Sequence, residues 1–153
     1  MKRQKFEVVP FDRSHIPAVA GIERICFAEP WSENALELFA GDGAFAFAAV
    51  SRDRVPLGYA GMLIAADEGQ LLNLAVLPEA RRQGIGAALL SALLSEAERR
   101  GLRSVSLEVR VSNQAAIRLY ERFGFRSVGV RKHFYRHPAE DASVMIRDLS
   151  EPS

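Results

Sequence analysis

The chain has very little cysteine, and this scarcity excludes two kinds of small stabilised protein. Cys26 is the single cysteine among 153 residues, so it cannot close an internal disulfide or build a zinc site from several cysteines. Long apolar stretches are also missing: the longest, Ala44 to Val50, is far shorter than the roughly 20 residues of a membrane-spanning helix. No apolar signal core follows the basic start of the chain. We therefore expect a cytoplasmic protein without a membrane partner.

Net charge is nearly absent as well. At +1 it gives no support for a nucleic-acid partner. The charges are nevertheless unevenly spread: residues 78–136 hold 12 Lys or Arg against 5 Asp or Glu, residues 1–77 hold 7 against 10, and residues 137–153 hold 1 against 4. A basic middle segment suits a small polyanionic ligand and equally suits a solvated helix face. The length and the 48% hydrophobic content predict one folded domain over residues 1–153.

Hydrophobic periodicity predicts strands and helices in a mixed order. Ser14, Ser32 and Ser112 are the expected helix caps, and Gly101 and Gly124 lie where helices should end. Three successive apolar runs separated by turn signals are typical of an antiparallel meander. The order predicts an α/β protein of α+β character, with helices on the faces of a mixed sheet. The expected strands span 6–11, 44–51, 57–66, 70–77, 102–109, 125–132 and 142–149, and the expected helices span 14–27, a short segment from 32, 85–100 and 112–123.

A loop with two glycines connects the strand at 70–77 to the longest helix. A helix start exposes unpaired N–H groups, and Gly84 and Gly86 would let a phosphate approach the backbone without a Cβ in the way. Arg81 and Arg82 add positive charge. The loop lacks both the Gly-Lys-Ser/Thr of a nucleotide P-loop and the third glycine of the dinucleotide fingerprint. Taken alone, the two glycines fit tight strand–helix packing as well as phosphate binding.

A second stretch carries a carboxylate and a phenol. In the strand over 102–109, alternation places Glu108 away from the most apolar face. Tyr120 lies in a helix among apolar neighbours, so we expect it to be partly buried with its hydroxyl near a partner. On their own these positions also fit a surface glutamate paired with Arg110 and a core tyrosine with a hydrated tip.

Both stretches resemble the GCN5-related N-acetyltransferases (GNAT). The loop over 81–86, Arg-x-x-Gly-x-Gly after a hydrophobic strand, resembles the acyl-CoA loop of that family. The run over 107–125 resembles its members that acetylate the alanine-starting ends of ribosomal proteins, and so do Pro-Trp-Ser at 30–32 and His-Phe-Tyr at 133–135. The resemblance implies the GNAT fold, with about seven strands and about four helices, and acetyl-CoA as the co-substrate without a metal.

The resemblance also implies a role for each matching residue. Glu108 corresponds to the general base, Tyr120 to the general acid, and Asn113 to a residue that contacts the coenzyme. Trp31 and Tyr135 correspond to the acceptor side, although Trp31 equally fits a core position. Backbone groups of Leu74, Ala75 and Val76 would pair with the pantetheine arm, and the N–H of Val76 would face the oxyanion. The residues implied to bind the pyrophosphate are Arg82, Gln83, Gly84, Ile85, Gly86 and Ala87.

These roles are chemically reasonable for an α-amine acceptor. An α-amine has a pKa of about 7.7 to 8.0, against about 10.4 for lysine, so Glu108 can remove its proton directly or through water at neutral pH. A phenol of pKa about 10 can protonate the departing thiolate, which suits Tyr120. Cys26 lies on the apolar stripe of the first helix, so we expect it to pack there and the acetyl group to move without an acyl-enzyme.

The sequence therefore predicts transfer of acetyl from acetyl-CoA to the N-terminal α-amine of a protein, with an alanine-starting ribosomal protein favoured. Phe134 stands where the family often has an aromatic hydroxyl, so another protein terminus or a small amine remains an alternative. A non-catalytic acyl-CoA sensor is the alternative of a different class, against which Glu108 and Tyr120 argue. His133 and His137 are four residues apart, but Pro138 follows and no helix is indicated, so we expect loop residues and no metal pair.

Overall fold

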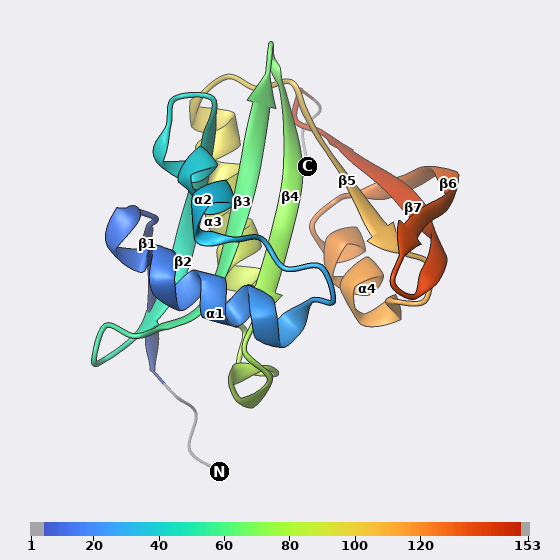
Figure 1. Ribbon diagram of the computed structural model, residues 1–153. Helices are drawn as coiled ribbons and strands as arrows, with labels where there is room; N and C mark the ends of the chain where they lie inside the picture. Colours follow the sequence, from blue (N-terminus) through green and yellow to red (C-terminus); the bar gives the residue numbers. More distant parts are fainter. Residues whose placement is uncertain (1–4, 151–153) are drawn as a thin grey trace.

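The structure, a computed structural model, describes residues 5–150, and within them one seven-stranded sheet carries helices on its faces (Figure 1). This confirms the predicted mixed sheet. The strands are β1 (Phe6–Pro10), β2 (Ala44–Ser51), β3 (Pro56–Ala65), β4 (Glu68–Val76), β5 (Ser104–Arg110), β6 (Arg126–Arg136) and β7 (Ala139–Asp148). The helices are α1 (Ile16–Cys26), α2 (Glu33–Leu36), α3 (Ile85–Arg99) and α4 (Gln114–Arg122), with short 3-10 turns η1 (Arg13–His15), η2 (Glu37–Ala40) and η3 (Pro78–Ala80).

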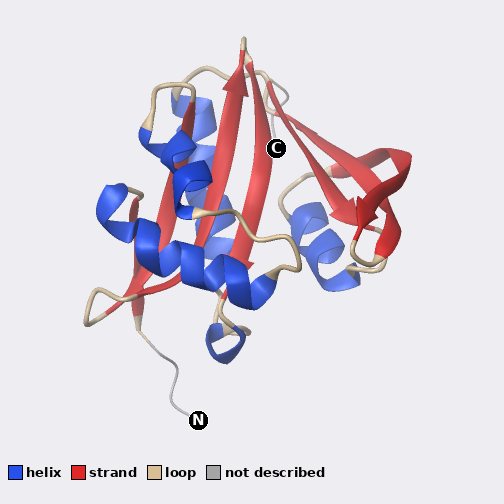
Figure 2. Ribbon diagram, in the orientation of Figure 1, coloured by secondary structure: helices blue, strands red, loops and turns tan. Residues whose placement is uncertain are grey.

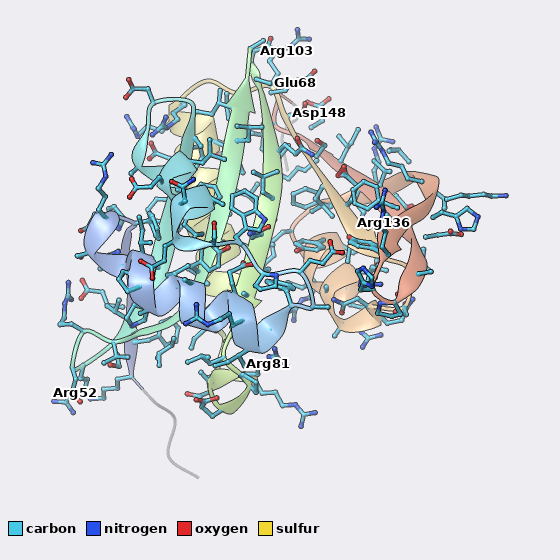
Figure 3. The ribbon with its side chains drawn as sticks, in the orientation of Figure 1. Arg52, Glu68, Arg81, Arg103, Arg136 and Asp148 are labelled. Carbon is cyan, nitrogen blue, oxygen red and sulfur yellow. The ribbon has the colours of Figure 1, made fainter. Side chains whose placement is uncertain are left out.

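The strand order is β1-β2-β3-β4-β5-β7-β6, and the strands pair antiparallel everywhere except between β4 and β5. That parallel contact is short, because only residues 68–70 of β4 pair with 104–106 of β5. Figure 2 shows the two strands separating beyond this point, and Figure 3 shows Glu68 and Arg103 at the joined end. The edge of β4 beyond Gln70 is therefore not paired with β5.

A bulge in β4 lies just beyond the joined end. Gly61 of β3 pairs with Asn73 and Met62 pairs with Leu71, so Leu72 is an extra residue in β4. Such a bulge increases the local twist and bends the bulged strand. It coincides with the place where β4 leaves β5.

Two apolar clusters hold the helices against opposite faces of the sheet. On one face α1 and η2 pack on β2 and β3, with Val19, Ile22 and Phe39 buried. On the other face α3 packs through its leucines, and the same cluster takes in Tyr120 and Phe125, which joins α4 to the core. None of the helices within residues 5–150 is long and apolar enough to span a membrane.

Two of the three expected serine caps are wrong. Ser32 does cap α2, because its Oγ accepts the N–H of Ala35 at 3.1 Å. Near Ser14, however, Asp12 is the cap: it accepts the Ser14 N–H at 2.8 Å, and a 3-10 turn precedes α1. At α4 the cap is Asn113, not Ser112. In both cases neighbouring polar residues compete for the cap, and the carboxylate or amide wins.

The expected loop over 133–141 is also wrong, since β6 and β7 continue through most of it as a hairpin. β6 reaches Arg136 and β7 begins at Ala139, so only His137 and Pro138 form the turn. His133 is thus a strand residue, although its φ of 56° and the register shift nearby mark an irregularity. Nearly all of β6 is exposed, which removes the alternation that reveals a strand in the sequence.

Candidate active site

A cleft of about 670 Å³ opens where β4 and β5 separate. One bank is the end of α1 with the loop that follows it, and the opposite bank is the β6–β7 hairpin. The floor is made by β4, β5 and the first turns of α4. The lining residues are Glu23, Cys26 to Glu29 and Trp31 from the first bank, Phe134 to Pro138 from the second, and residues 71–74 and 108–110 with Asn113, Ala116 and Tyr120 from the floor.

Glu108 reaches the cleft because β5 alternates along its whole length. Leu107 and Val109 are buried in the core, and Glu108 is half-buried on the opposite side, as predicted. The side-chain amide of Gln70 donates to its carboxylate at 3.4 Å. Glu108 is not paired with Arg110, whose guanidinium instead contacts Glu140 at 3.2 Å. The structure thus leaves Glu108 at the cleft surface, available to a substrate.

Tyr120 approaches the same cleft from α4. It is more buried than expected, with only 6% of its surface exposed, and its ring meets Phe125 edge-on at 5.7 Å. Burial raises the pKa of its phenol above the ordinary value, so the hydroxyl carries its proton at neutral pH. A protonated phenol on the cleft wall can donate to a leaving group.

Asn113 also lines the cleft, but its side-chain carbonyl oxygen, Oδ1, already accepts a hydrogen bond. That oxygen accepts the N–H of Ala116 at 3.2 Å and so starts α4. The side-chain NH₂ group of Asn113 is what remains for a ligand. Its predicted contact with the coenzyme stays a prediction.

The glycine loop lies outside the lining of this cleft. Gly84 precedes α3 with a φ of 84°, a conformation that glycine adopts readily, and a Cβ built there would meet nothing within 4 Å. A Cβ on Gly86 would lie 3.6 Å from Leu119, which is ordinary contact. Tight packing therefore requires neither glycine, and the open backbone at the start of α3 favours the anion-binding alternative.

Arg81 does not extend from this loop as a free charge. Its Nε donates to the carbonyl oxygen of Val76 at 3.0 Å, and its Nη2 lies 3.6 Å from the sulfur of Cys26. The guanidinium of Arg81 ties the end of α1 to the end of β4, and its expected contribution to an anion site stays a prediction. Cys26 packs beside the apolar cluster under α1, as expected, and it also borders the cleft.

The structure brings together six of the fourteen predicted site residues in the lining of this cleft. Leu74, Trp31 and Tyr135 line the cleft with Glu108, Asn113 and Tyr120. Ala75 is buried, and neither it nor Val76 nor residues 82–87 belong to the lining. Within the described residues, no group of three or more His, Cys, Asp or Glu side chains could hold a metal ion.

Sequence reasoning missed Glu23, the most buried charged residue of the site. It is 1% exposed, and its carboxylate accepts hydrogen bonds from the Trp31 N–H at 2.8 Å, from Asn73 Nδ2 at 3.1 Å and from the hydroxyl of Tyr59. Burial raises its pKa above the ordinary value. A signal was available, because Glu23 occupies the apolar stripe of α1, three positions after Ala20 and four after Val19.

The opposite bank depends on Arg110, which was also missed. Its guanidinium donates to the carbonyl oxygens of Pro138 at 2.8 Å and His137 at 3.0 Å, and it lies over the ring of Tyr135 at 4.2 Å. Glu140 completes the arrangement by accepting the Ser112 N–H at 2.7 Å. These contacts hold the hairpin turn against the end of β5.

Comparison with known proteins agrees with this geometry. Residues 16–125 match the model of the acetyltransferase (GNAT) family. The ribosomal protein bS18-alanine N-acetyltransferase of Escherichia coli (strain K12) is 37% identical over 141 residues, which cover 91% of this chain and 95% of that protein. The enzyme of the same name from Salmonella typhimurium is 37% identical over 137 residues, covering 88% and 92%. The crystal structure of the Escherichia coli enzyme superposes with a TM-score of 0.88 at 34% identity and covers 97% of each chain.

Proposed function

Since the chain belongs to the acetyltransferase (GNAT) family and is an acetyl-CoA-dependent N-acetyltransferase, we propose that its acceptor is the N-terminal α-amine of a protein, specifically an alanine-starting ribosomal protein of the bS18 kind. The relatives named for that reaction match about nine-tenths of the chain. The observation that carries the proposal is that Glu108 and Tyr120, from β5 and α4, line one cleft at the separation of β4 and β5.

In this proposal Glu108 acts as the base. It takes a proton from the acceptor amine, directly or through one water, and the amine nitrogen then attacks the thioester carbonyl carbon. As the carbon–sulfur bond of the tetrahedral intermediate breaks, the nitrogen loses its remaining extra proton to water, which leaves a neutral amide. Tyr120 gives its proton to the departing thiolate, so the products are the acetylated amine and free CoA. The phenol of Tyr120 is protonated at neutral pH, as this role requires, because its ordinary pKa is already about 10.

On the coenzyme side, the unpaired edge of β4 supports binding of the pantetheine arm by the backbone of Leu74, Ala75 and Val76. The pyrophosphate would lie at the start of α3, on the N–H groups of residues 82–87. The left-handed conformation of Gly84 and the open space beside it support this assignment. Asn113 would contact the coenzyme through its free amide group.

On the acceptor side, Trp31 and Tyr135 would hold the peptide between the two banks. Glu29 on the first bank and Glu108 on the floor both give the cleft a carboxylate, which suits an approaching ammonium group. Phe134 is 43% exposed on the hairpin bank and offers the peptide an apolar surface.

The test is turnover with defined acceptors. Purified protein, acetyl-CoA and a peptide with the N-terminal sequence of bS18 should release CoA and give a product heavier by one acetyl group, placed on the α-amine by fragment mass spectrometry. Glu108→Gln should lower kcat/KM by about 100-fold or more, because it removes the base, and Tyr120→Phe should have an effect in the same direction. Binding of acetyl-CoA should be retained in both.

Glu7→Gln is the matched control, since Glu7 makes only an exposed ion pair with Arg54. Its kcat/KM should equal that of the wild type. Unchanged turnover of Glu108→Gln would remove Glu108 from the mechanism. Faster acetylation of spermidine than of the peptide would favour a small-amine acceptor, and acetyl-CoA binding without turnover of any amine would favour a sensor.

A further inference from the structure

Glu23 has no part in the chemistry proposed above, although it lies at the cleft. Both of its carboxylate oxygens accept hydrogen bonds: Oε1 accepts the Trp31 N–H, and Oε2 accepts the Tyr59 hydroxyl and Asn73 Nδ2. Asn73 Nδ2 also lies 2.7 Å from the Tyr59 hydroxyl, which closes the cluster. With three donors around it and 1% exposure, Glu23 cannot reach an acceptor amine.

The three donors belong to separate parts of the chain that meet at the cleft. Trp31 is in the loop after α1, which forms one bank of the cleft. Asn73 is in β4 beside the bulge at Leu72. Tyr59 is in β3 and fully buried. A single carboxylate therefore joins the loop after α1, on one bank of the cleft, to strand β4 on its floor.

The indole of Trp31 is fixed by a second contact. Its ring stacks on Phe39 with centroids 5.5 Å apart and planes 10° from parallel. The backbone of Trp31 is thus held by Glu23 and its ring by Phe39. Loss of the first contact would leave the ring stack alone to orient the residue.

Stability by itself is a poor reason for a carboxylate at this position. Burying a carboxylate is costly even when it is hydrogen-bonded, and replacing a buried polar network with packed apolar side chains is often neutral or stabilising. A glutamate here does what an apolar side chain cannot: it accepts three hydrogen bonds from fixed directions.

We propose that Glu23 is a positioning residue that fixes Trp31 and the acceptor-binding loop relative to β4. The inference rests on the proposed function for the role of Trp31, but the geometry it describes can be measured without activity. Trp31 is the only tryptophan in the chain, so its fluorescence reports on this loop alone.

The first measurement uses that fluorescence. Glu23→Gln places an NH₂ group among three donors and cannot satisfy them all. We expect acrylamide to quench Trp31 with a constant roughly twofold higher than in the wild type, with an unchanged far-ultraviolet circular dichroism spectrum. Equal quenching in the two proteins would overturn the proposal even if the enzyme proved to have another acceptor.

The second measurement separates positioning from general destabilisation. With the bS18 peptide, Glu23→Gln should raise KM by about tenfold while acetyl-CoA affinity stays within about twofold. Trp31→Ala should raise the peptide KM as well, and adding Glu23→Gln to Trp31→Ala should have no further effect, because the first change acts through the residue that the second removes. Multiplicative effects of the two substitutions would overturn the proposal.

Glu96→Gln is the matched control. Glu96 is a glutamate of α3 held by Arg99 and Arg100, and it does not line the cleft. Its substitution should leave quenching and KM unchanged. If Glu23→Gln does not fold, Tyr59→Phe removes one donor and keeps the bonds of Glu23 to Trp31 and Asn73; it should raise KM by about threefold, and no change would count against the proposal. If the wild type does not acetylate the peptide, the proposed acceptor is wrong while the quenching result still decides the role of Glu23.

Discussion

The two banks of the cleft are each held by a glutamate, but the two glutamates have opposite surroundings. Glu23 is 1% exposed and bonds only to neutral donors. Glu140, on the hairpin bank, has a side chain 17% exposed and pairs with Arg110, whose side chain is 28% exposed. Burial raises the pKa of Glu23, whereas hydrogen bonding to Ser112 and the nearby Arg110 lower that of Glu140.

This difference suggests that the two banks differ in rigidity. The α1 bank is part of a packed core, where rearrangement requires breaking several buried contacts at once. The hairpin bank is fixed by hydrogen bonds that water can replace, and β6 beside it is almost entirely exposed. We therefore expect the α1 bank to keep one shape and the hairpin bank to adjust to the acceptor.

The largest expected effect comes from crowding the α1 bank at Gly61→Ala. A Cβ at this position would lie less than 3.0 Å from the ring of Phe39, which supports Trp31. The variant should lose about 2 to 3 kcal/mol of unfolding free energy in urea titrations. Gly43→Ala is the control, because a Cβ there meets nothing within 4 Å, and it should stay close to the wild type. A small loss of unfolding free energy in Gly61→Ala would mean that this bank rearranges more easily than its packing indicates.

A smaller effect is expected from loosening the hairpin bank at Arg110→Met. The substitution removes the donors to the carbonyl oxygens of His137 and Pro138 and the charge over Tyr135. We expect the peptide KM to rise about fivefold and the unfolding free energy to fall by only about 1 kcal/mol, because water can solvate the freed carbonyls. Arg126→Met, on exposed β6, is the control. A stability loss larger than that of Gly61→Ala would contradict the comparison.

The smallest effect is the pH dependence, and its sign differs between the banks. The ordinary glutamate value is 4.5; a raised folded pKa for Glu23 means that its protonated form stabilises the fold below 4.5 and that this contribution is lost as pH rises through the raised value. The lowered pKa of Glu140 gives stability above 4.5 that is lost as pH falls. The Tm of each variant should therefore be compared with that of the wild type between pH 3 and 7. The difference in Tm between the wild type and Glu23→Gln should become smaller as the pH rises. The difference between the wild type and Glu140→Gln should become larger. Parallel curves would show that the two carboxylates do not differ.

The elements of the fold were largely visible in the sequence because their buried faces repeat. The strand expected over 44–51 is β2 itself, and the helix expected over 85–100 is α3 to within one residue. Glu108 was placed correctly because strict alternation in β5 leaves it one possible face. Local periodicity carries this information, and β6 shows the limit, since an exposed strand has no such pattern.

The cluster around Glu23 was not visible, because its partners are distant in the chain. Tyr59 is 36 residues away and Asn73 is 50 residues away, and no local pattern links three such positions. The cleft itself depends on where β4 and β5 stop pairing, a place that coincides with the bulge at Leu72. The residues of the site could be chosen from motifs, but the contacts that hold them arise only in three dimensions.

The brief parallel pairing of β4 with β5 makes that end of the sheet a pivot. Val76 lies six residues beyond Gln70 along β4, about 20 Å at a strand rise of about 3.4 Å, so a rotation of about 5° at the pivot moves the far end by roughly 2 Å. We therefore expect the spacing of the two strands to depend on the shared core, where Leu119 of α4 packs against the cluster that contains the leucines of α3. A change of one methyl group in that core, far from any substrate, would rotate β4 slightly relative to β5. The rotation would change the distance between the reacting groups at the far end of the two strands.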